Sequence, residues 1–135
     1  MPNCTRVIEF DAAHRVMKHE SKCRNLHGHR YKIELTVGGE LDSLGRVIDF
    51  SVMKRVFGGW VDEHLDHGCI LFDADQDVAK LCEVNGWRFF LMDSNPTAEN
   101  MAELLFEKAK ELLPELMVVR LRLYETPNCW SEVSR

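Results

Sequence analysis

The alternation of apolar and polar side chains is clearest over residues 29–37. The odd-numbered positions place five side chains on one face of an extended chain: His29, Tyr31, Ile33, Leu35 and Val37. The even-numbered positions carry charged or hydroxyl side chains. This segment is therefore predicted to be a β-strand with one buried face.

Five further segments have the short apolar runs that indicate strands. They are residues 4–10, 46–48, 87–92, 117–125 and 128–133. The stretch 11–29 between the first two strands contains four histidines and little apolar periodicity, so we interpret it as a loop. The region 68–94 shows no clear pattern apart from the strand at 87–92.

Two segments have helical periodicity. The first is capped by Asp49 or Ser51 and runs to about Glu63, with a break possible at Gly58-Gly59. The second begins at Asn95-Pro96-Thr97, where either Asn95 or Thr97 is the cap. Its apolar stripe contains Met101, Leu104, Leu105, Leu112 and Leu113.

The order of elements is strand, strand, helix, helix, strand, strand, with the added strand at 87–92. This order is typical of an α+β fold in which an antiparallel sheet carries two helices on one face. The chain has 135 residues, so we expect one domain spanning 1–135.

Composition limits the kinds of molecule that the protein is expected to bind and the cellular compartment in which it is expected to lie. The formal net charge is -5, which argues against nucleic acid or an anionic membrane as a partner. No run of 18 apolar residues and no secretory signal is visible. The five cysteines are scattered without a C-x-x-C pair, which favours reduced thiols and a cytoplasmic location.

The histidines of the loop suggest a metal site. His27 and His29 are two residues apart at the start of a strand, so both rings point to the same side. His14 is a candidate third ligand if the end of the preceding strand lies beside them, and His19 is its rival. Three imidazoles with one open position are the ligand set of catalytic zinc.

Cys23 lies four residues before His27 and allows two interpretations. It is either a fourth metal ligand, which would close the site, or a free thiol whose pKa is lowered by a nearby cation. The pair Asp66-His67 likewise has two interpretations. It is a proton-transfer pair in which the carboxylate orients the ring, or a polar pair at a helix end.

Glu125 ends an apolar strand face formed by Val119, Leu121 and Leu123. A carboxylate at that position needs a partner, because an unpaired buried charge is unfavourable. It can form a salt bridge, or it can accept two parallel N–H bonds from the amino-pyrimidinone edge of a pterin or guanine.

Six short stretches, in this order, resemble the 6-pyruvoyltetrahydropterin synthase superfamily. They are F-D-A-A-H-R around His14, C-R-N-L-H-G-H around Cys23, G-R-V-I-D-F at 45–50, L-D-H at 65–67, N-P-T-A-E-N at 95–100 and Y-E-T at 124–126. The resemblance runs from about residue 6 to the end. It is strongest to the branch that makes 6-carboxytetrahydropterin for queuosine and other deazapurines.

The resemblance implies a role for each matching residue. His14, His27 and His29 match the zinc ligands, Cys23 matches the catalytic thiol, and Asp66 and His67 match its partner dyad. Glu125 matches the anchor of the pterin ring, with Thr97 near the same pocket. Arg15, Lys18, Arg24 and Lys54 are candidates for binding a triphosphate.

The resemblance also implies a fold, a reaction and an assembly. The fold is the tunnelling fold, and the assembly is a hexamer made of two trimers with active sites between subunits. The implied substrate is 7,8-dihydroneopterin triphosphate. Triphosphate and acetaldehyde are lost in the carboxy-producing branch, whereas other members of the fold make 6-pyruvoyltetrahydropterin. A non-catalytic zinc- or pterin-binding subunit is the alternative from another functional class.

Overall fold

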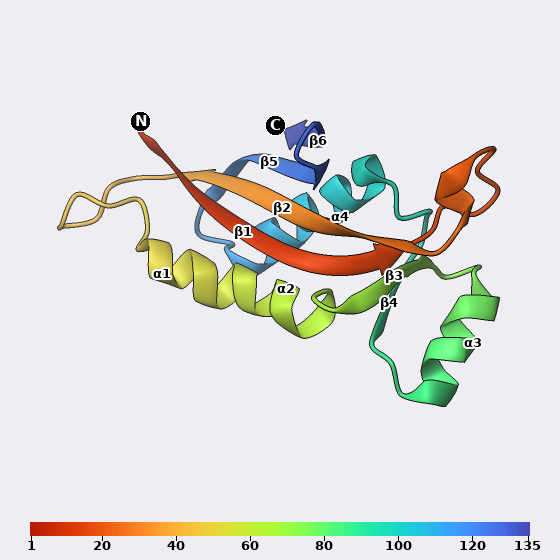
Figure 1. The fold of residues 1–135 in the computed structure, drawn as a ribbon. Helices are drawn as coiled ribbons and strands as arrows, with labels where there is room; N and C mark the ends of the chain where they lie inside the picture. Colours follow the sequence, from red (N-terminus) through yellow and green to blue (C-terminus); the bar gives the residue numbers. More distant parts are fainter.

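The computed structural model describes residues 1–135 and contains one curved six-stranded sheet with the strand order β4-β3-β1-β2-β5-β6 (Figure 1). The strands are β1 (Asn3–His14), β2 (His27–Gly38), β3 (Gly68–Phe72), β4 (Phe89–Met92), β5 (Met117–Thr126) and β6 (Cys129–Ser134). The helices are α1 (Phe50–Met53), α2 (Gly59–His64), α3 (Gln76–Asn85) and α4 (Ala98–Leu112).

The long β1–β2 hairpin is the centre of the sheet. The two strands pair antiparallel over their whole length, from Asn3 opposite Gly38 to His14 opposite His27. On β2, Tyr31, Ile33, Leu35 and Val37 are all fully buried, so the predicted inward face is confirmed.

The expected loop at 11–29 is shorter than predicted, because extended backbone reaches His14 and resumes at His27. Residues 12–14 pair with β2 on one side and with β3 on the other. Neighbouring strands therefore hold this part of the chain extended, although its own sequence shows no apolar alternation.

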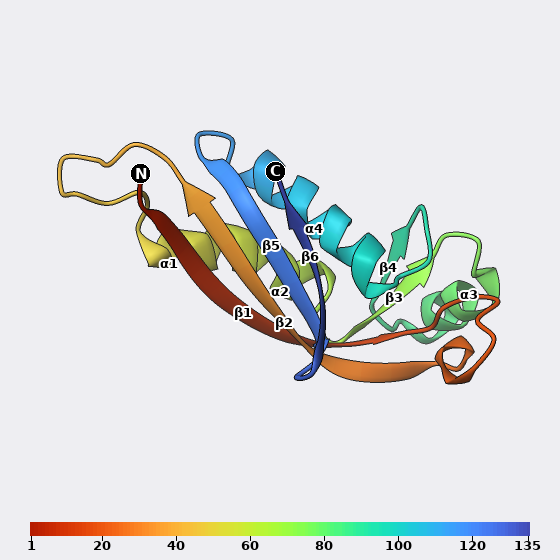
Figure 2. The same ribbon diagram turned by 90° about the horizontal axis from the view of Figure 1, so that it is seen from above.

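One face of the antiparallel strands carries the core. The α1–α2 segment and α4 both pack against this face, as Figure 2 shows from above. Met53, Phe57 and Val61 from the first segment and Leu105 and Phe106 from α4 are almost completely buried. The opposite face of these strands carries charged side chains.

The first helical segment is continuous. The Asp49 carboxylate accepts hydrogen bonds from the Ser51 amide at 2.9 Å and the Ser51 hydroxyl at 2.8 Å, so Asp49 is the cap. A π-helical turn over Lys54–Gly58 joins α1 to α2, and Gly58-Gly59 does not break the helix. The predicted strand at 46–48 is absent, because the Asp42 carboxylate accepts the amides of Leu44 and Arg46 in a tight turn.

The region 68–94 forms a strand–helix–strand unit, of which the sequence predicted only the last strand. β3 pairs parallel with both β1 and β4, so the sheet is mixed instead of fully antiparallel. α3 ends at Gly86, whose φ of +69° is a conformation that suits glycine. The α+β class and the two helices on one face are confirmed, with α3 as an addition at one end of the molecule.

The helices are short, and none combines the length and the apolar character needed to cross a membrane. All five cysteines are free.

Candidate metal centre

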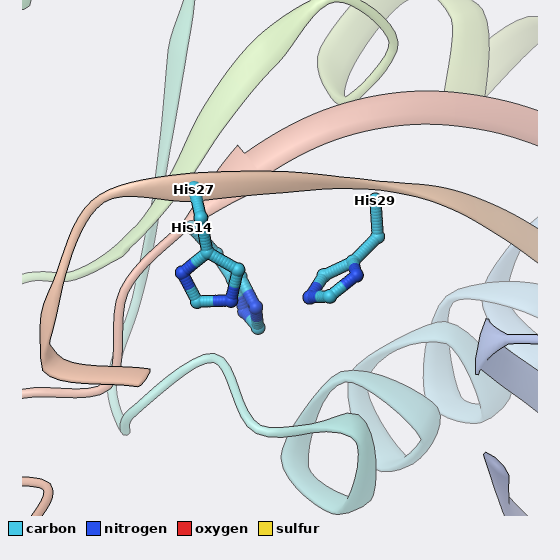
Figure 3. A group of neighbouring side chains, drawn as sticks. All are labelled: His14, His27 and His29. Atoms are coloured by element: carbon cyan, nitrogen blue, oxygen red, sulfur yellow. The ribbon is translucent and has the colours of Figure 1, made fainter. Parts of the chain in front are cut away.

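The β1–β2 hairpin brings three histidines to one point on the inward face of the sheet. His14 is the last residue of β1 and lies opposite His27, the first residue of β2, while His29 follows two positions later on the same face. One ligand nitrogen from each ring lies within 4.8 Å of the other two. Figure 3 shows the three rings pointing into one space beside the start of α4. The antiparallel hairpin therefore explains why His14 belongs with the pair.

Backbone carbonyls orient two of these rings. The Nδ1 atom of His14 lies 2.8 Å from the carbonyl oxygen of Pro96, and that of His27 lies 2.7 Å from the carbonyl oxygen of Asn25. A carbonyl oxygen can only accept, so each Nδ1 carries the proton and each Nε2 keeps its lone pair. This outer-shell arrangement is typical of metal-ligating histidines.

Burial disfavours the charged form of two of these rings. Desolvation lowers the pKa of His14, which is 1 % exposed, and also lowers the pKa of His29. The Nε2 atoms of both residues are buried without a hydrogen-bond partner. Neutral rings with unpartnered lone pairs fit a transition-metal ion, which would satisfy both atoms at once.

The converging group contains three protein residues. His19, the rival third ligand, lies outside the cluster, and its Nδ1 accepts the Ser21 amide at 2.9 Å. Cys23 lies in a single 3₁₀ turn, Lys22–Arg24, and its sulfur is not among the converging ligand atoms. A three-histidine site leaves a coordination position for another molecule, which is the arrangement of catalytic metal sites.

The loop that carries Cys23 is clamped to the start of α4. The Asn95 side chain accepts the Met17 amide at 2.9 Å, and its amide nitrogen lies 3.3 Å from the Met17 carbonyl oxygen. The neighbouring Val16 amide donates to the Cys23 carbonyl at 2.7 Å. The sequence marked Asn95 only as a possible helix cap, and the distance of 78 residues to Met17 concealed this contact.

Thr97 is the cap of α4, since its hydroxyl accepts the Asn100 amide at 3.1 Å. It directly follows Pro96, so the start of α4 lies next to His14. A second contact anchors the beginning of the loop: the Arg15 guanidinium donates to the buried Asp75 carboxylate at 2.6 and 2.5 Å. Arg15 is therefore already paired and is a poor candidate for binding phosphate.

Glu125 lies beside the histidines. Its carboxylate is 3.5 Å from the Nε2 atom of His29, and no Lys or Arg side chain forms an ion pair with it. The ladder between β2 and β5 ends with Lys32 opposite Tyr124, and beyond that point the strands separate. A hollow of about 360 Å³ opens there, and both His29 and Glu125 line it. The carboxylate thus adjoins the cluster through His29, while His14 and His27 do not line this hollow.

Asp66 and His67 form the expected dyad but lie away from the cluster. Their side chains are 2.8 Å apart, and His67 is 76 % exposed with a φ of +59°. The Asp11 amide donates to the Asp66 carboxylate at 3.0 Å, and the His67 amide donates to the Asp11 carbonyl at 2.7 Å. None of the three clustered histidines lines the hollow beside His67. Within one chain, the dyad and the metal cluster are separate.

Comparisons with known proteins agree with this geometry. The family model described as "6-pyruvoyl tetrahydropterin synthase" matches residues 3–135. Proteins named "6-carboxy-5,6,7,8-tetrahydropterin synthase" from Rickettsia felis and Rickettsia bellii are 45% and 43% identical to this chain. Both alignments cover 98% of this chain and 100% of the relative.

Solved structures share the fold. The 6-pyruvoyl tetrahydropterin synthase of Caenorhabditis elegans superposes with a TM-score of 0.71 at 27% identity, covering 100% of this chain and 97% of that one. An uncharacterised protein from Wolinella succinogenes reaches a TM-score of 0.85 at 22% identity, with 99% and 98% covered, which supports the fold alone.

Proposed function

This chain belongs to the 6-pyruvoyl tetrahydropterin synthase family, and from that premise we propose that it is a zinc-dependent 6-carboxy-5,6,7,8-tetrahydropterin synthase. Its substrates are 7,8-dihydroneopterin triphosphate and one water molecule, and its products are 6-carboxytetrahydropterin, acetaldehyde and triphosphate. It is a lyase that acts on a pterin side chain in the cytoplasm, in the synthesis of queuosine. Near-full-length identity of 43–45% to relatives with this name supports the assignment.

The carboxylate of Glu125 suits the ring of a pterin. Glu125 accepts the two N–H groups on the amino-pyrimidinone edge of the ring, with Thr97 near the bound ring. The ring's hydroxylated side chain then extends toward His14, His27 and His29. These three residues would hold zinc, which would supply a Lewis acid for the oxygens of the side chain.

The remaining residues move protons. Cys23 takes a proton from a side-chain carbon next to a polarised oxygen, which yields the enol needed for loss of triphosphate. His67, oriented by the Asp66 carboxylate, exchanges protons on the other side of the same side chain. No redox cofactor is required for these steps.

The position of the dyad supports an assembly in which one active site is shared by two chains. Asp66 and His67 lie on an exposed surface apart from the cluster of their own chain. We propose that they serve the cluster of a neighbouring copy, within a homohexamer made of two trimers. The substrate would then be enclosed between subunits.

The converging histidine nitrogens carry this proposal, and a product assay tests it. Purified zinc-loaded protein is incubated with 7,8-dihydroneopterin triphosphate, and acetaldehyde and the pterin product are identified. Release of acetaldehyde in equal amount to 6-carboxytetrahydropterin is the expected result. Formation of 6-pyruvoyltetrahydropterin without acetaldehyde would place the protein in the other branch.

The Cys23→Ala variant separates an enzyme from a binding subunit. We expect it to retain zinc at the wild-type stoichiometry and to lose nearly all turnover, because the thiol is a base and not a ligand. Loss of the metal would show that the sulfur is a ligand. Unchanged activity would remove Cys23 from the reaction.

A further inference from the structure

The buried hydroxyl of Tyr31 lacks an explanation in the fold. Tyr31 is fully buried, and its hydroxyl has no hydrogen-bond partner within the chain. An unsatisfied buried hydroxyl is unfavourable, so native proteins rarely keep one without a reason. Phenylalanine would fill the same space without this penalty.

The position of Tyr31 connects this hydroxyl with the metal centre. Tyr31 follows His29 by two residues on the same strand face, and its ring lies edge-on to those of His29 and His14, at 5.6 and 5.9 Å between centroids. Glu125 is close to the same histidines, since its carboxylate lies 3.5 Å from the Nε2 atom of His29. Tyr31 is therefore packed against two of the three clustered histidines, one of which is next to Glu125.

Most of the unpartnered buried atoms belong to the histidine cluster and to Tyr31, which packs against it. Four buried side-chain polar atoms in the chain lack a partner: His14 Nε2, His29 Nε2, the Tyr31 hydroxyl and Arg120 Nε. A metal ion accounts for the two histidine nitrogens. The Tyr31 hydroxyl belongs to the same inward cluster, but phenols of neutral tyrosine are weak metal ligands compared with imidazole, so its partner is of another kind.

The packing of the ring explains only its apolar part. Tyr31 stacks on Phe10 with ring centroids 5.0 Å apart and an interplanar angle of 13°. This contact would be equally good with phenylalanine, since it does not involve the hydroxyl. A tyrosine hydroxyl carries its proton at neutral pH, which makes it a hydrogen-bond donor.

We propose that the Tyr31 hydroxyl donates a hydrogen bond to a side-chain oxygen of the bound pterin, and so helps to select substrates with a hydroxylated side chain. The inference rests on the proposed function, because it requires the pterin side chain to reach the three histidines. Tyr31 then adds one directed contact to the side chain, while Glu125 recognises the ring.

Two pterins test the contact without turnover. 7,8-Dihydroneopterin carries side-chain hydroxyls, whereas 6-methyl-7,8-dihydropterin has none; the affinity of each for zinc-loaded protein is measured by fluorescence titration. Tyr31→Phe is expected to weaken binding of dihydroneopterin about three- to tenfold, as expected for one neutral hydrogen bond, and to leave binding of the methyl compound unchanged. Zinc content should equal that of the wild type.

Thermal unfolding of the metal-free protein provides the matched control. Tyr31→Phe should unfold at the same or a higher temperature than the wild type, since it removes an unpaired hydroxyl. Tyr124→Phe is the same chemical change at a hydroxyl that lies 3.3 Å from the Arg122 guanidinium, and it should lower the unfolding temperature. A destabilised Tyr31→Phe protein would mean that the hydroxyl is bonded inside the fold, and the inference would be wrong.

The remaining outcomes separate the inference from the proposed function. If the wild type binds neither pterin, both the proposed function and the proposed role of Tyr31 are wrong. If the wild type prefers dihydroneopterin and Tyr31→Phe keeps the same preference, only the role of Tyr31 is wrong.

Discussion

The histidine cluster and the Asp66-His67 dyad contain the same kind of side chain in opposite surroundings. His14 is 1 % exposed, and a backbone carbonyl fixes its ring. His67 is 76 % exposed, and the carboxylate of its neighbour holds its ring. The cluster is complete within one chain, whereas the dyad has no reaction partner there.

This difference indicates a division of labour. A buried site made by one hairpin needs no second copy to bind its metal, because strand pairing alone positions the ligands. An exposed dyad on a separate surface acquires a function only when another molecule covers it. Metal binding should therefore depend on the single chain, and turnover should depend on the assembly.

The largest effect is expected from removing a ligand of the cluster. His14→Ala deletes one of the three proposed metal ligands and leaves a buried space that water cannot fill with the same geometry. We expect zinc affinity to fall by more than about 100-fold, beyond the loss typical of an outer-shell change, and turnover to become undetectable. Elemental analysis and a chelator competition measure the metal.

His19→Ala is the control for this change, because His19 lies outside the cluster, on the loop that follows β1. It should retain zinc at the wild-type stoichiometry. If His14→Ala keeps its zinc while His19→Ala loses it, the metal does not bind at the histidine cluster, and the contrast between a buried metal site and an exposed dyad is wrong.

The next prediction tests the dyad in oligomers that contain two different variants of the chain. Cys23→Ala and His67→Ala should each lower turnover by about 10²- to 10⁴-fold, the usual contribution of a proton-transfer group. Co-expressed in equal amounts, they should recover about a quarter of wild-type activity if random assembly pairs intact clusters with intact dyads of neighbouring chains. Activity per zinc is the quantity to measure.

A second mixture controls for unspecific rescue. Cys23 and Glu125 both belong to the cluster side, so co-expression of Cys23→Ala with Glu125→Gln leaves every active site with one defect. This mixture should stay inactive. Equal recovery in both mixtures, or in neither, would mean that the dyad does not complete a neighbouring site.

A smaller effect is expected from the clamp on the Cys23 loop. Asn95→Ala removes two hydrogen bonds to the Met17 backbone, each worth about 1 kcal/mol, so turnover should fall by up to about thirtyfold. Zinc should remain, because the carbonyl of Pro96 still holds His14. Asn95→Asp keeps the acceptor for the Met17 amide and should be intermediate.

Asn85→Ala is the matched control for the clamp. The Asn85 side chain donates to the Leu81 carbonyl at the end of α3, outside the cluster, and its loss should leave turnover unchanged. Loss of zinc in Asn95→Ala would show that the clamp acts on His14 instead of on the loop of Cys23.

The His27/His29 pair was predictable from local pattern, whereas His14 was chosen over His19 by the family resemblance. His27 and His29 share a strand face by parity, and an antiparallel hairpin returns the chain from His14 to the same place. The inward face of β2 and the helices at 50–64 and 98–112 follow from periodicity in the same way. These features depend on neighbours in sequence.

The features that sequence reasoning missed depend on distant contacts. Extended backbone at 11–14 is imposed by β2 and β3 on its two sides, and α3 has weak apolar periodicity with its end set by Gly86. The Asn95–Met17 clamp joins residues 78 positions apart. Tertiary context decides such contacts, so no local pattern reveals them.

The smallest expected effect is on the pH dependence of the stability that Asp66 contributes. Partial burial alone would raise the pKa of Asp66, but hydrogen bonds from the Asp11 amide and from His67 together lower it. A carboxyl with a depressed folded-state pKa stabilises the protein above its unfolded value of about 4, and this contribution is lost as the pH falls through the lower folded value. Asp66→Asn should therefore be less stable than the wild type at pH 6 by about 1 kcal/mol or less, with the difference shrinking toward pH 3.

Urea unfolding at both pH values measures this difference in stability. The control variant is His67→Asn, which keeps the Asp11 contact and suits the positive φ, and it should retain part of the pH dependence. A difference that grows toward low pH would mean that Asp66 is held protonated, and its carboxylate could not orient His67 for proton transfer.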